Sequence, residues 1–237
     1  MNLILVSAEE LQGNRVQLSD RRLQHLREVH RAAEGELLRV GLIDGPMGSG
    51  TLTRLTPALA ELELDLDQPP PPPLPLTLLL ALPRPKMLKR ILQGISALGI
   101  KRLILINSYR VEKSYWQSPW LRPEAIREQL ILGLEQARDT RLPEVVLEKR
   151  FKPFVEDRLP ALAAGKRCLL AHPGSHQGAP HRLQEESLLA IGPEGGFIPY
   201  EVEKLEQAGF SGVHIGPRIQ RVENAIPLIV GKLYDNF

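Results

Sequence analysis

The chain has few of the residues that stabilise secreted domains and metal sites. It holds one cysteine among 237 residues, so no internal disulfide can form, and we expect a reducing, cytoplasmic location. Its six histidines show no ligand spacing with that cysteine or with one another, so we expect no metal site. The cysteine, Cys168, lies in the apolar run 167–171 and is predicted to be a buried small hydrophobe.

Aromatic residues and long apolar runs are also scarce. Aromatics make up 5% of the chain, so leucine, isoleucine and valine must fill the core. No apolar run is long enough to cross a bilayer, so we expect no membrane partner. The first six residues carry no basic leader and are too short for a signal peptide. The hydrophobic content of 43% is ordinary for a globular protein, and the length suits one large domain or two small ones.

Lysine is absent from residues 1–67, which carry seven arginines against eleven acidic residues, a net charge of −4. The rest of the chain carries 23 basic and 17 acidic residues, a net charge of +6. Basic residues still outnumber acidic ones locally, at Arg15, Arg21, Arg22, Arg27 and Arg31. Such a patch is suited to nucleic-acid phosphates, and a solvated amphipathic helix is an equally good interpretation.

Proline is concentrated at residues 68–75, where five consecutive prolines follow Gln68. Serial proline forms neither helix nor central strand and stiffens the chain, so this stretch is predicted to be a spacer between domains 1–67 and 76–237. A proline-motif ligand is the alternative, which the position between two folded segments disfavours.

The two parts differ in their predicted elements. Before the prolines, short strands are expected at 2–6, 15–18, 36–40, 50–55 and 60–66, with a helix at 20–31 and a hairpin turn at 44–46, a pattern typical of a small barrel. After them, strands are expected at 76–82, 102–107, 145–147, 168–171, 188–191 and 213–215. Helices are expected between them at 86–98, 123–138, 153–164, 199–208 and 223–234. This alternation predicts an α/β fold with a parallel sheet covered on both faces.

Two glycine-proline loops are the strongest functional signal. Residues 191–197 (Ile-Gly-Pro-Glu-Gly-Gly-Phe) and 215–225 (Ile-Gly-Pro-Arg-Ile-Gln-Arg-Val-Glu-Asn-Ala) each follow a short apolar run. Their spacing fits neither the dinucleotide fingerprint nor a P-loop. Each loop alone is explained by an ordinary strand-to-helix turn. Together, with Glu194, Arg218, Arg221 and Glu223 in or beside them, they favour a pocket that reads a nucleotide-like ligand through the backbone.

At these residues the chain resembles a known family. The two loops, with 205–210 between them, are similar to the RsmE-type ribosomal RNA uridine N3-methyltransferases of the SPOUT superfamily. Weaker similarities are Glu135-Gln136 followed by 141–144, the segment 171–173, and His25-Leu26 with Val29 and Arg31. The resemblance covers nearly the whole chain and is strongest over the last fifty or so residues.

The resemblance implies a fold, a reaction and partners. Residues 1–67 would form a PUA-like, RNA-binding β-barrel, and residues 76–237 a SPOUT α/β domain whose C-terminal trefoil knot holds S-adenosylmethionine. The substrate would be small-subunit ribosomal RNA, free or in the assembled subunit, and the protein a homodimer packed through the knot. RNA contacts are assigned to Arg21, Arg22, Arg27, Arg31 and Arg218.

The donor is expected to lie against residues 191–196 and 215–219, chiefly through backbone groups, with the adenine on apolar side chains. The residues assigned to it are Leu170, His172, Ile191, Gly192, Pro193, Glu194, Gly195, Gly196, Ile215, Gly216, Pro217, Ile219 and Arg221. Arg221 would hold a phosphate or the charge developing on the uracil, and Glu223 would act as base or orient Arg221. The alternative is an Arg221–Glu223 ion pair that only stabilises the last helix. Glu194 would approach the sulfonium or cap the next helix.

The sequence departs from the family's pattern at several positions. Gly94 and Ala97 replace a lysine and a glutamate, Asp139 stands in the segment after Glu135-Gln136, Val222 and Asn224 replace threonines, and 198–199 lack a capping serine. These changes leave open an RNA-binding or assembly protein without turnover, or a SPOUT enzyme with another target nucleotide. Tyr115, Trp116 and Trp120 are candidates for base stacking, for core packing or for a dimer contact.

Overall fold

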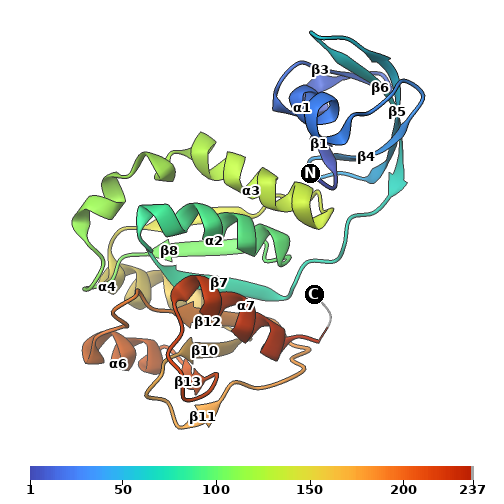
Figure 1. Ribbon diagram of the computed structural model, residues 1–237. Coiled ribbons are helices and arrows are strands. Elements are labelled where there is room, and N and C mark those ends of the chain that lie inside the picture. Colours follow the sequence, from blue (N-terminus) through green and yellow to red (C-terminus); the bar gives the residue numbers. More distant parts are fainter. Residues whose placement is uncertain (236–237) are drawn as a thin grey trace. The chain divides into compact units, whose positions relative to one another are not determined.

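The computed structural model describes residues 1–235, and in it the chain divides into two units, each with its own sheet (Figure 1). The first unit comprises residues 1–72 and the later segment 131–142, and the second comprises 73–130 and the chain from 143 onwards. The division between residues 72 and 73 falls in the proline run, where the chain can form neither helix nor central strand.

The first unit is built on a six-stranded sheet of order β1-β4-β5-β6-β3-β2. β1 pairs in parallel with β4, and the other neighbours are antiparallel. The strands are β1 (Ile4–Val6), β2 (Leu11–Gln12), β3 (Arg15–Leu18), β4 (Leu37–Leu42), β5 (Met47–Leu55) and β6 (Ala60–Gln68). Within the described residues β1 and β2 are the edges of an open sheet, so the sheet is a half-barrel and the separate barrel predicted from the sequence is not confirmed.

The helix predicted at 20–31 is formed in two parts. A 3₁₀ turn, η1 (Ala8–Glu10), precedes it in the chain, and α1 (Arg21–Gln24) begins at Asp20, whose carboxylate accepts from the Arg22 N–H at 2.8 Å. The chain then widens into a π-helical segment, η2 (His25–His30), which ends at Arg31 with a φ of 56°. A left-handed residue cannot continue a right-handed helix, so the segment stops there.

The core of the first unit draws on both parts of the chain that form it. Alternate residues of the strands, such as Val16 and Leu18, are fully buried in its main cluster. A second cluster places Leu134, from the later segment, against Leu3 and Leu5. The backbone confirms this attachment, since the Asn2 N–H donates to the Glu135 carbonyl at 3.1 Å.

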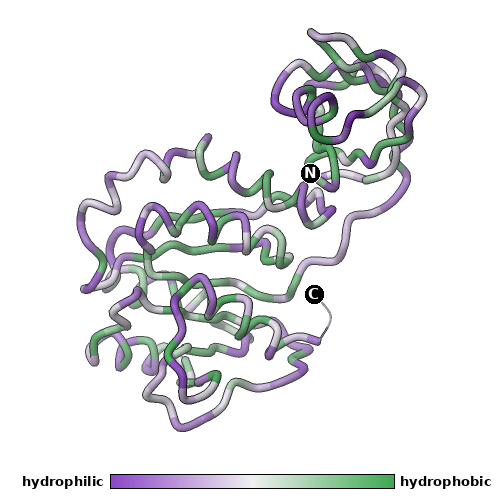
Figure 2. Tube along the Cα trace, viewed as in Figure 1, coloured by the Kyte–Doolittle hydropathy of each residue, from purple (hydrophilic) through white to green (hydrophobic). Residues whose placement is uncertain are grey.

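The second unit is built on a seven-stranded, entirely parallel sheet of order β11-β13-β10-β12-β7-β8-β9. The strands are β7 (Leu76–Ala81), β8 (Arg102–Ile106), β9 (Glu144–Glu148), β10 (Arg167–Ala171), β11 (Gln177–Gly178), β12 (Ser187–Ile191) and β13 (Ser211–His214). Central strands are buried on both faces and form the hydrophobic centre of this unit in Figure 2. Such continuous apolar strands are typical of a parallel sheet, and the predicted α/β fold is confirmed.

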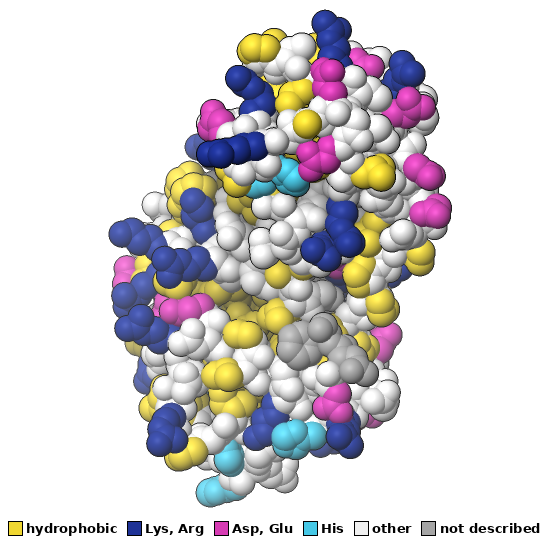
Figure 3. Space-filling model, turned by 45° about the vertical axis from the view of Figure 1, so that its right-hand side comes forward, with side chains coloured by type: hydrophobic (Ala, Val, Ile, Leu, Met, Phe, Trp, Pro, Cys, Tyr) yellow, Lys and Arg dark blue, Asp and Glu magenta, His cyan; other side chains and the backbone are white. Residues whose placement is uncertain are grey.

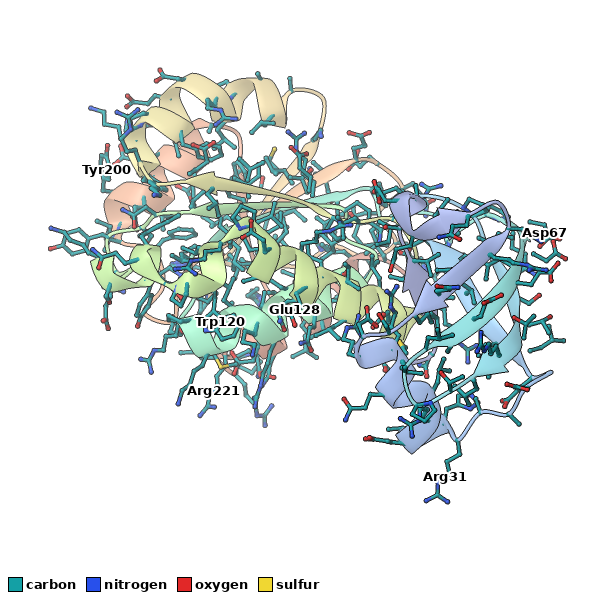
Figure 4. All side chains as sticks on the ribbon, turned by 90° about the horizontal axis from the view of Figure 1, so that it is seen from above. Arg31, Asp67, Trp120, Glu128, Tyr200 and Arg221 are labelled. Atoms are coloured by element: carbon teal, nitrogen blue, oxygen red, sulfur yellow. The ribbon has the colours of Figure 1, made fainter. Side chains whose placement is uncertain are left out.

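Helices cover both faces of this sheet (Figures 1 and 4). The helical segments from residue 85 onwards are α2 (Pro85–Ala97), η3 (Lys113–Gln117), η4 (Pro119–Leu121), α3 (Pro123–Ala137), α4 (Phe151–Pro153), η5 (Phe154–Arg158), α5 (Leu159–Ala163), α6 (Pro199–Gln207) and α7 (Val222–Leu233). The part of α3 from residue 131 onwards belongs to the first unit. Helix α2 shows the reason: Leu88, Ile91 and Ile95 recur at helical spacing and are buried. The helix predicted at 153–164 is formed as one continuous helical stretch from Phe151 to Ala163, whose middle part, Phe154–Arg158, is π-helical.

Cys168 is buried in β10, and burial raises the pKa of its thiol, as expected for a packed cysteine.

Of residues 1–235, no helix is long and apolar enough to span a membrane. No three His, Cys, Asp or Glu side chains in the same range gather where they could hold a metal ion.

Candidate functional site

The two glycine-proline loops lie side by side at one edge of the parallel sheet. Strand β12 ends at Ile191 and β13 ends at His214, and only β10 separates them. Ala171, the last residue of β10, pairs with Ile191 on one side and Val213 on the other. The loops that leave these strands therefore start at the same level and enclose a cavity of about 290 Å³.

Glycine is required where the first loop turns. A Cβ on Gly192 would lie 3.0 Å from the backbone N of Phe197, closer than most side chains allow. Gly196 has a φ of 74°, and its N–H donates to the Pro193 carbonyl at 2.7 Å, which closes a tight turn. In the second loop Gly216 has a φ of 132° and donates to His214 Nδ1 at 3.1 Å. Both loops thus expose main chain to the cavity with little side chain in the way.

Most residues assigned to the donor line this cavity. They are His172, Ile191, Gly192, Pro193, Glu194, Gly196, Ile215, Gly216, Ile219 and Arg221. Three do not: Leu170, Gly195 and Pro217. Leu170 has no exposed surface, because β10 is a central strand covered on both faces, so the expected contact of its side chain with the adenine is not available in this structure.

Other lining residues were missed by the sequence reasoning. They are Ala171, Pro173, Phe197, Val213, His214, Gln220, Val222, Ala225 and Ile229. The last three recur at i, i+3 and i+7 along α7, so one face of that helix forms a wall of the cavity. The helical periodicity of the sequence after the second loop could have identified these three residues.

Glu194 lines the cavity, and its carboxylate contacts Arg84, which is not a lining residue. Its carboxylate lies 3.8 Å from Arg84 Nε and accepts from the Arg84 backbone N–H at 3.5 Å. It does not cap the following helix. Glu201 fills that role, because its side chain accepts from the N–H of Ile198, the N-cap residue of α6, at 3.0 Å. This contact replaces the capping hydroxyl that the sequence lacks.

Arg221 stands at the mouth of the cavity and begins α7, its carbonyl accepting from the Ala225 N–H at 2.8 Å. Within residues 1–235 Arg221 forms no ion pair with Glu223. The structure therefore does not show the alternative, in which such a pair only stabilises the last helix. Glu223 is partly exposed and lies outside the cavity lining. Figure 4 shows the Arg221 side chain directed away from the ribbon.

The arginines assigned to RNA fall into different environments. Arg22 is only 8% exposed and is held by Glu10 and Asp20, so its assignment to RNA is corrected: it is a structural cation of the first unit. Arg21 is half exposed and makes a bidentate pair with Glu135 at 2.8 Å. Arg27 and Arg31 are exposed, and Arg31 points away from its unit in Figure 4.

Arg218, the remaining RNA candidate, is exposed and lines the donor cavity.

Some positions that depart from the family pattern have structural roles. Asp139 is buried and accepts from the Arg141 N–H at 3.0 Å, and Val222 is a buried wall of the cavity. Ala97 and Asn224 are exposed, and Gly94 faces open space.

The three aromatic candidates already have partners. The Trp116 indole N–H donates to the Asn107 side chain at 2.8 Å, and Lys89 lies 4.0 Å over the Trp120 ring. The Tyr115 hydroxyl donates to Glu112 at 3.1 Å. Tyr109 is different: it is 80% exposed, and the sequence reasoning did not single it out.

Comparisons with known proteins agree with this architecture. The RNA methyltransferase domain family matches residues 70–233. The ribosomal RNA small subunit methyltransferase E of Treponema pallidum is 29% identical over 95% of this chain and 87% of its own length. The methyltransferase E 1 of Borreliella burgdorferi is 23% identical over 95% of this chain and 94% of its own.

A solved structure shares the fold. The ribosomal RNA small subunit methyltransferase E of Neisseria gonorrhoeae, bound to S-adenosyl methionine, superposes with a TM-score of 0.74 at 24% identity and covers 98% of this chain and 95% of that one. The family match spans more than half of the chain and includes both loops of the cavity. The chain therefore belongs to the RNA methyltransferase domain family and is of the RsmE type within the SPOUT superfamily.

Proposed function

We propose that this protein transfers a methyl group from S-adenosylmethionine to N3 of a uridine in small-subunit ribosomal RNA. The cavity between the two glycine-proline loops carries this proposal. It lies at the carboxyl ends of parallel strands, where α/β folds bind nucleotide-like ligands. The names of the relatives from Treponema and Borreliella support ribosomal RNA of the small subunit as the substrate.

The residues present fit the donor. The cavity, at about 290 Å³, is close to the lower end of the range of small-molecule sites, roughly 300 Å³. Its apolar walls suit an adenine, and Ile219, which is 81% exposed, would gain burial when a ligand covers it. The backbone of 191–196 and 215–219 would hold the nucleoside, and Glu194 supplies a negative charge for the sulfonium side.

The bound donor supplies a methyl group already activated on a sulfonium, so the protein chiefly positions the acceptor and excludes water. Uridine N3 carries a proton at neutral pH and must lose it. The Arg221 guanidinium has no acidic partner within residues 1–235 and lines the cavity, so it would be available to stabilise negative charge on the uracil. Glu223, outside the cavity, is retained as a candidate for orienting Arg221 or for accepting the proton.

Cations gather where RNA would approach. Arg84 and Arg110 follow β7 and β8, and Arg218 and Arg221 follow β13, so three loops bring guanidinium groups to the same edge of the sheet. Figure 3 shows Lys and Arg side chains gathered along one side of the α/β unit. Such a cluster favours a phosphate backbone as partner.

The remaining features of the resemblance belong to the same proposal. We infer a C-terminal knot, a PUA-like role of the first unit with Arg27 and Arg31 as RNA contacts, a cytoplasmic location and a homodimer packed through the second unit. Support for the dimer comes from Leu228, which is 52% exposed on α7 and lines an open groove with Pro227 and Gly231. Sedimentation equilibrium measures that stoichiometry.

The reaction is tested with purified protein, S-adenosylmethionine and small-subunit ribosomal RNA, followed by mass spectrometry of the nucleosides. N3-methyluridine is expected. Although Arg221 lines the cavity, the donor is expected to be held chiefly by backbone groups, so the variant Arg221→Ala is expected to bind the donor normally in calorimetry. It is expected to lose about 100-fold or more in methylation rate, since it removes one charge-stabilising group. Wild-type turnover in that variant would remove Arg221 from the mechanism.

A second outcome separates the alternatives that the sequence left open. Donor binding without any modified nucleoside, in free RNA or in assembled subunits, would identify an RNA-binding or assembly protein. A modified nucleoside other than N3-methyluridine would identify another target. Either result leaves the donor cavity in place and overturns the proposed reaction.

A further inference from the structure

Residues 108–110, which follow strand β8, lie against the first glycine-proline loop. The Arg110 guanidinium donates to the Gly195 carbonyl. A Cβ on Gly195 would lie 2.9 Å from Arg110 Cδ, and one on Gly196, which lines the cavity, would lie 4.0 Å from Arg110 Nη1. The two loops are 85 residues apart in sequence at this contact, and they meet at the rim of the donor cavity.

A buried carboxylate fastens the two loops together. Glu201, on α6, is 2% exposed. One oxygen accepts from the Tyr109 N–H at 2.7 Å, and the other accepts from the Ile198 N–H at 3.0 Å and from the Ser108 hydroxyl at 3.3 Å. A buried charge is tolerated when several donors satisfy it, and hydrogen bonds to a carboxylate are stronger than neutral ones. Glu201 therefore fixes the backbone of Ser108–Tyr109 relative to the donor loop.

The fixed backbone presents a free aromatic ring. Tyr109 is 80% exposed although its own N–H is held by a buried group. The other aromatics of this stretch are engaged: Trp116 with Asn107, and Trp120 with Lys89. An exposed ring on a rigid backbone beside an arginine is suited to stacking on an unpaired RNA base.

We propose that Ser108–Arg110 is an acceptor-binding loop, in which the Tyr109 ring stacks on an RNA base next to the target uridine and Glu201 is the positioning residue that holds the loop at the cavity rim. This inference rests on the proposed RNA methyltransferase function and adds the element that selects and orients the acceptor. Arg110, the next residue in the loop, contributes a cation that is hydrogen-bonded to the donor loop at Gly195.

The test compares Tyr109→Ala, Tyr109→Phe and Tyr200→Ala. Tyr200 is 44% exposed, lies on α6 close to Lys204, and is on the other side of the unit from Arg221 in Figure 4, so it is a matched control. Binding of a small-subunit ribosomal RNA transcript is measured without donor by fluorescence anisotropy, and the KM for RNA with donor. Donor affinity is measured by calorimetry.

Tyr109→Ala is expected to weaken RNA binding and raise the KM by about 5-fold to 100-fold, the worth of one stacked base, with donor affinity unchanged. Tyr109→Phe and Tyr200→Ala are expected to match the wild type, because stacking needs the ring and not the hydroxyl. Wild-type RNA affinity and KM in Tyr109→Ala would overturn the inference. RNA binding that depends on Tyr109 in a protein without methylation would uphold it while the proposed reaction fails.

Glu201→Gln tests the positioning role. The amide nitrogen cannot accept a hydrogen bond, so one of the two loops loses its partner while the side chain keeps its volume. We expect the variant to raise the KM for RNA, and we expect the double variant Glu201→Gln, Tyr109→Ala to bind RNA no more weakly than Tyr109→Ala alone. Additive losses would show that Glu201 acts independently of the ring and would overturn its role.

Discussion

At the scale of single residues, Arg22 is a buried cation balanced by two carboxylates. Burial by itself would lower the pKa of this guanidinium, and hydrogen bonds with Glu10 and Asp20 outweigh it and raise the pKa. The same guanidinium donates to the Leu5 carbonyl at 2.7 Å, so it ties α1 to strand β1. Its role is to join elements of the first unit, and it cannot contact RNA without breaking these bonds.

The variant Arg22→Met is therefore expected to destabilise the first unit by about 1 to 3 kcal/mol, because the hydrogen bonds of a buried guanidinium are lost while the two carboxylates left behind, 32% and 52% exposed, are partly hydrated. Denaturation in urea followed by hydrogen exchange of β1 measures the loss. Arg27→Met, at an exposed position in the same segment, is the control and is expected to stay within about 0.5 kcal/mol of the wild type. A stable Arg22→Met variant would contradict the structural role.

The same pair of carboxylates gives this variant a pH signature. Burial by itself would raise the pKa of Glu10 and of Asp20. Hydrogen bonds from Arg22 outweigh burial and lower both pKa values below their ordinary values. Groups with a lowered folded pKa stabilise the fold above their unfolded values and lose that contribution as pH falls through the folded values. The wild type should lose stability below about pH 5, and Arg22→Met should lose less over the same range.

At the scale of elements, the first glycine-proline loop is shaped by close approach of its own backbone. Gly192→Ala would bring a methyl group to 3.0 Å from the Phe197 N and 3.2 Å from its ring, so the loop must shift. We expect donor affinity to fall about 10-fold or more in calorimetry, since a displacement of this kind affects positioning directly. The melting temperature should change little, because the loop lies outside the central strands.

Gly94→Ala is the matched control for that substitution. Gly94 lies inside α2, and an added Cβ meets nothing within 4 Å. Alanine is a better helix former than glycine by about 1 kcal/mol, so the variant should be as stable as the wild type or more so and should bind the donor equally well. Weakened donor binding in Gly94→Ala would show that the calorimetric assay reports general damage.

The element scale also shows what patterns predict well. Strand 15–18 follows from alternation of polar and apolar residues, and strand 187–191 from an apolar run. The end of α2 follows from Gly99, which lies just beyond it with a φ of 79°. The π-helical turns at His25–His30 and Phe154–Arg158 do not follow from the sequence pattern, because their apolar spacing still fits an ordinary helix. The two-residue strands β2 and β11 are too short to leave a pattern.

At the scale of the whole molecule, the donor should stabilise the two units differently. The cavity is formed by the second unit alone, so a ligand there adds binding free energy to that unit. At a donor concentration 100 times Kd the gain is about 2.7 kcal/mol. Hydrogen exchange with donor present should slow in β10, β12 and β13 and stay unchanged in β4 to β6. Equal protection of both sheets would contradict this assignment.

The sequence by itself determined the parallel α/β fold and the two loops, because apolar runs that end in Gly-Pro encode both buried strands and sharp turns. It could not show that α7 lines the cavity, that Leu170 is fully buried, or that Glu201 binds a loop 92 residues away in sequence. Those facts depend on strand order and on which donors meet a buried carboxylate. Such contacts between distant segments exist only after the chain has folded.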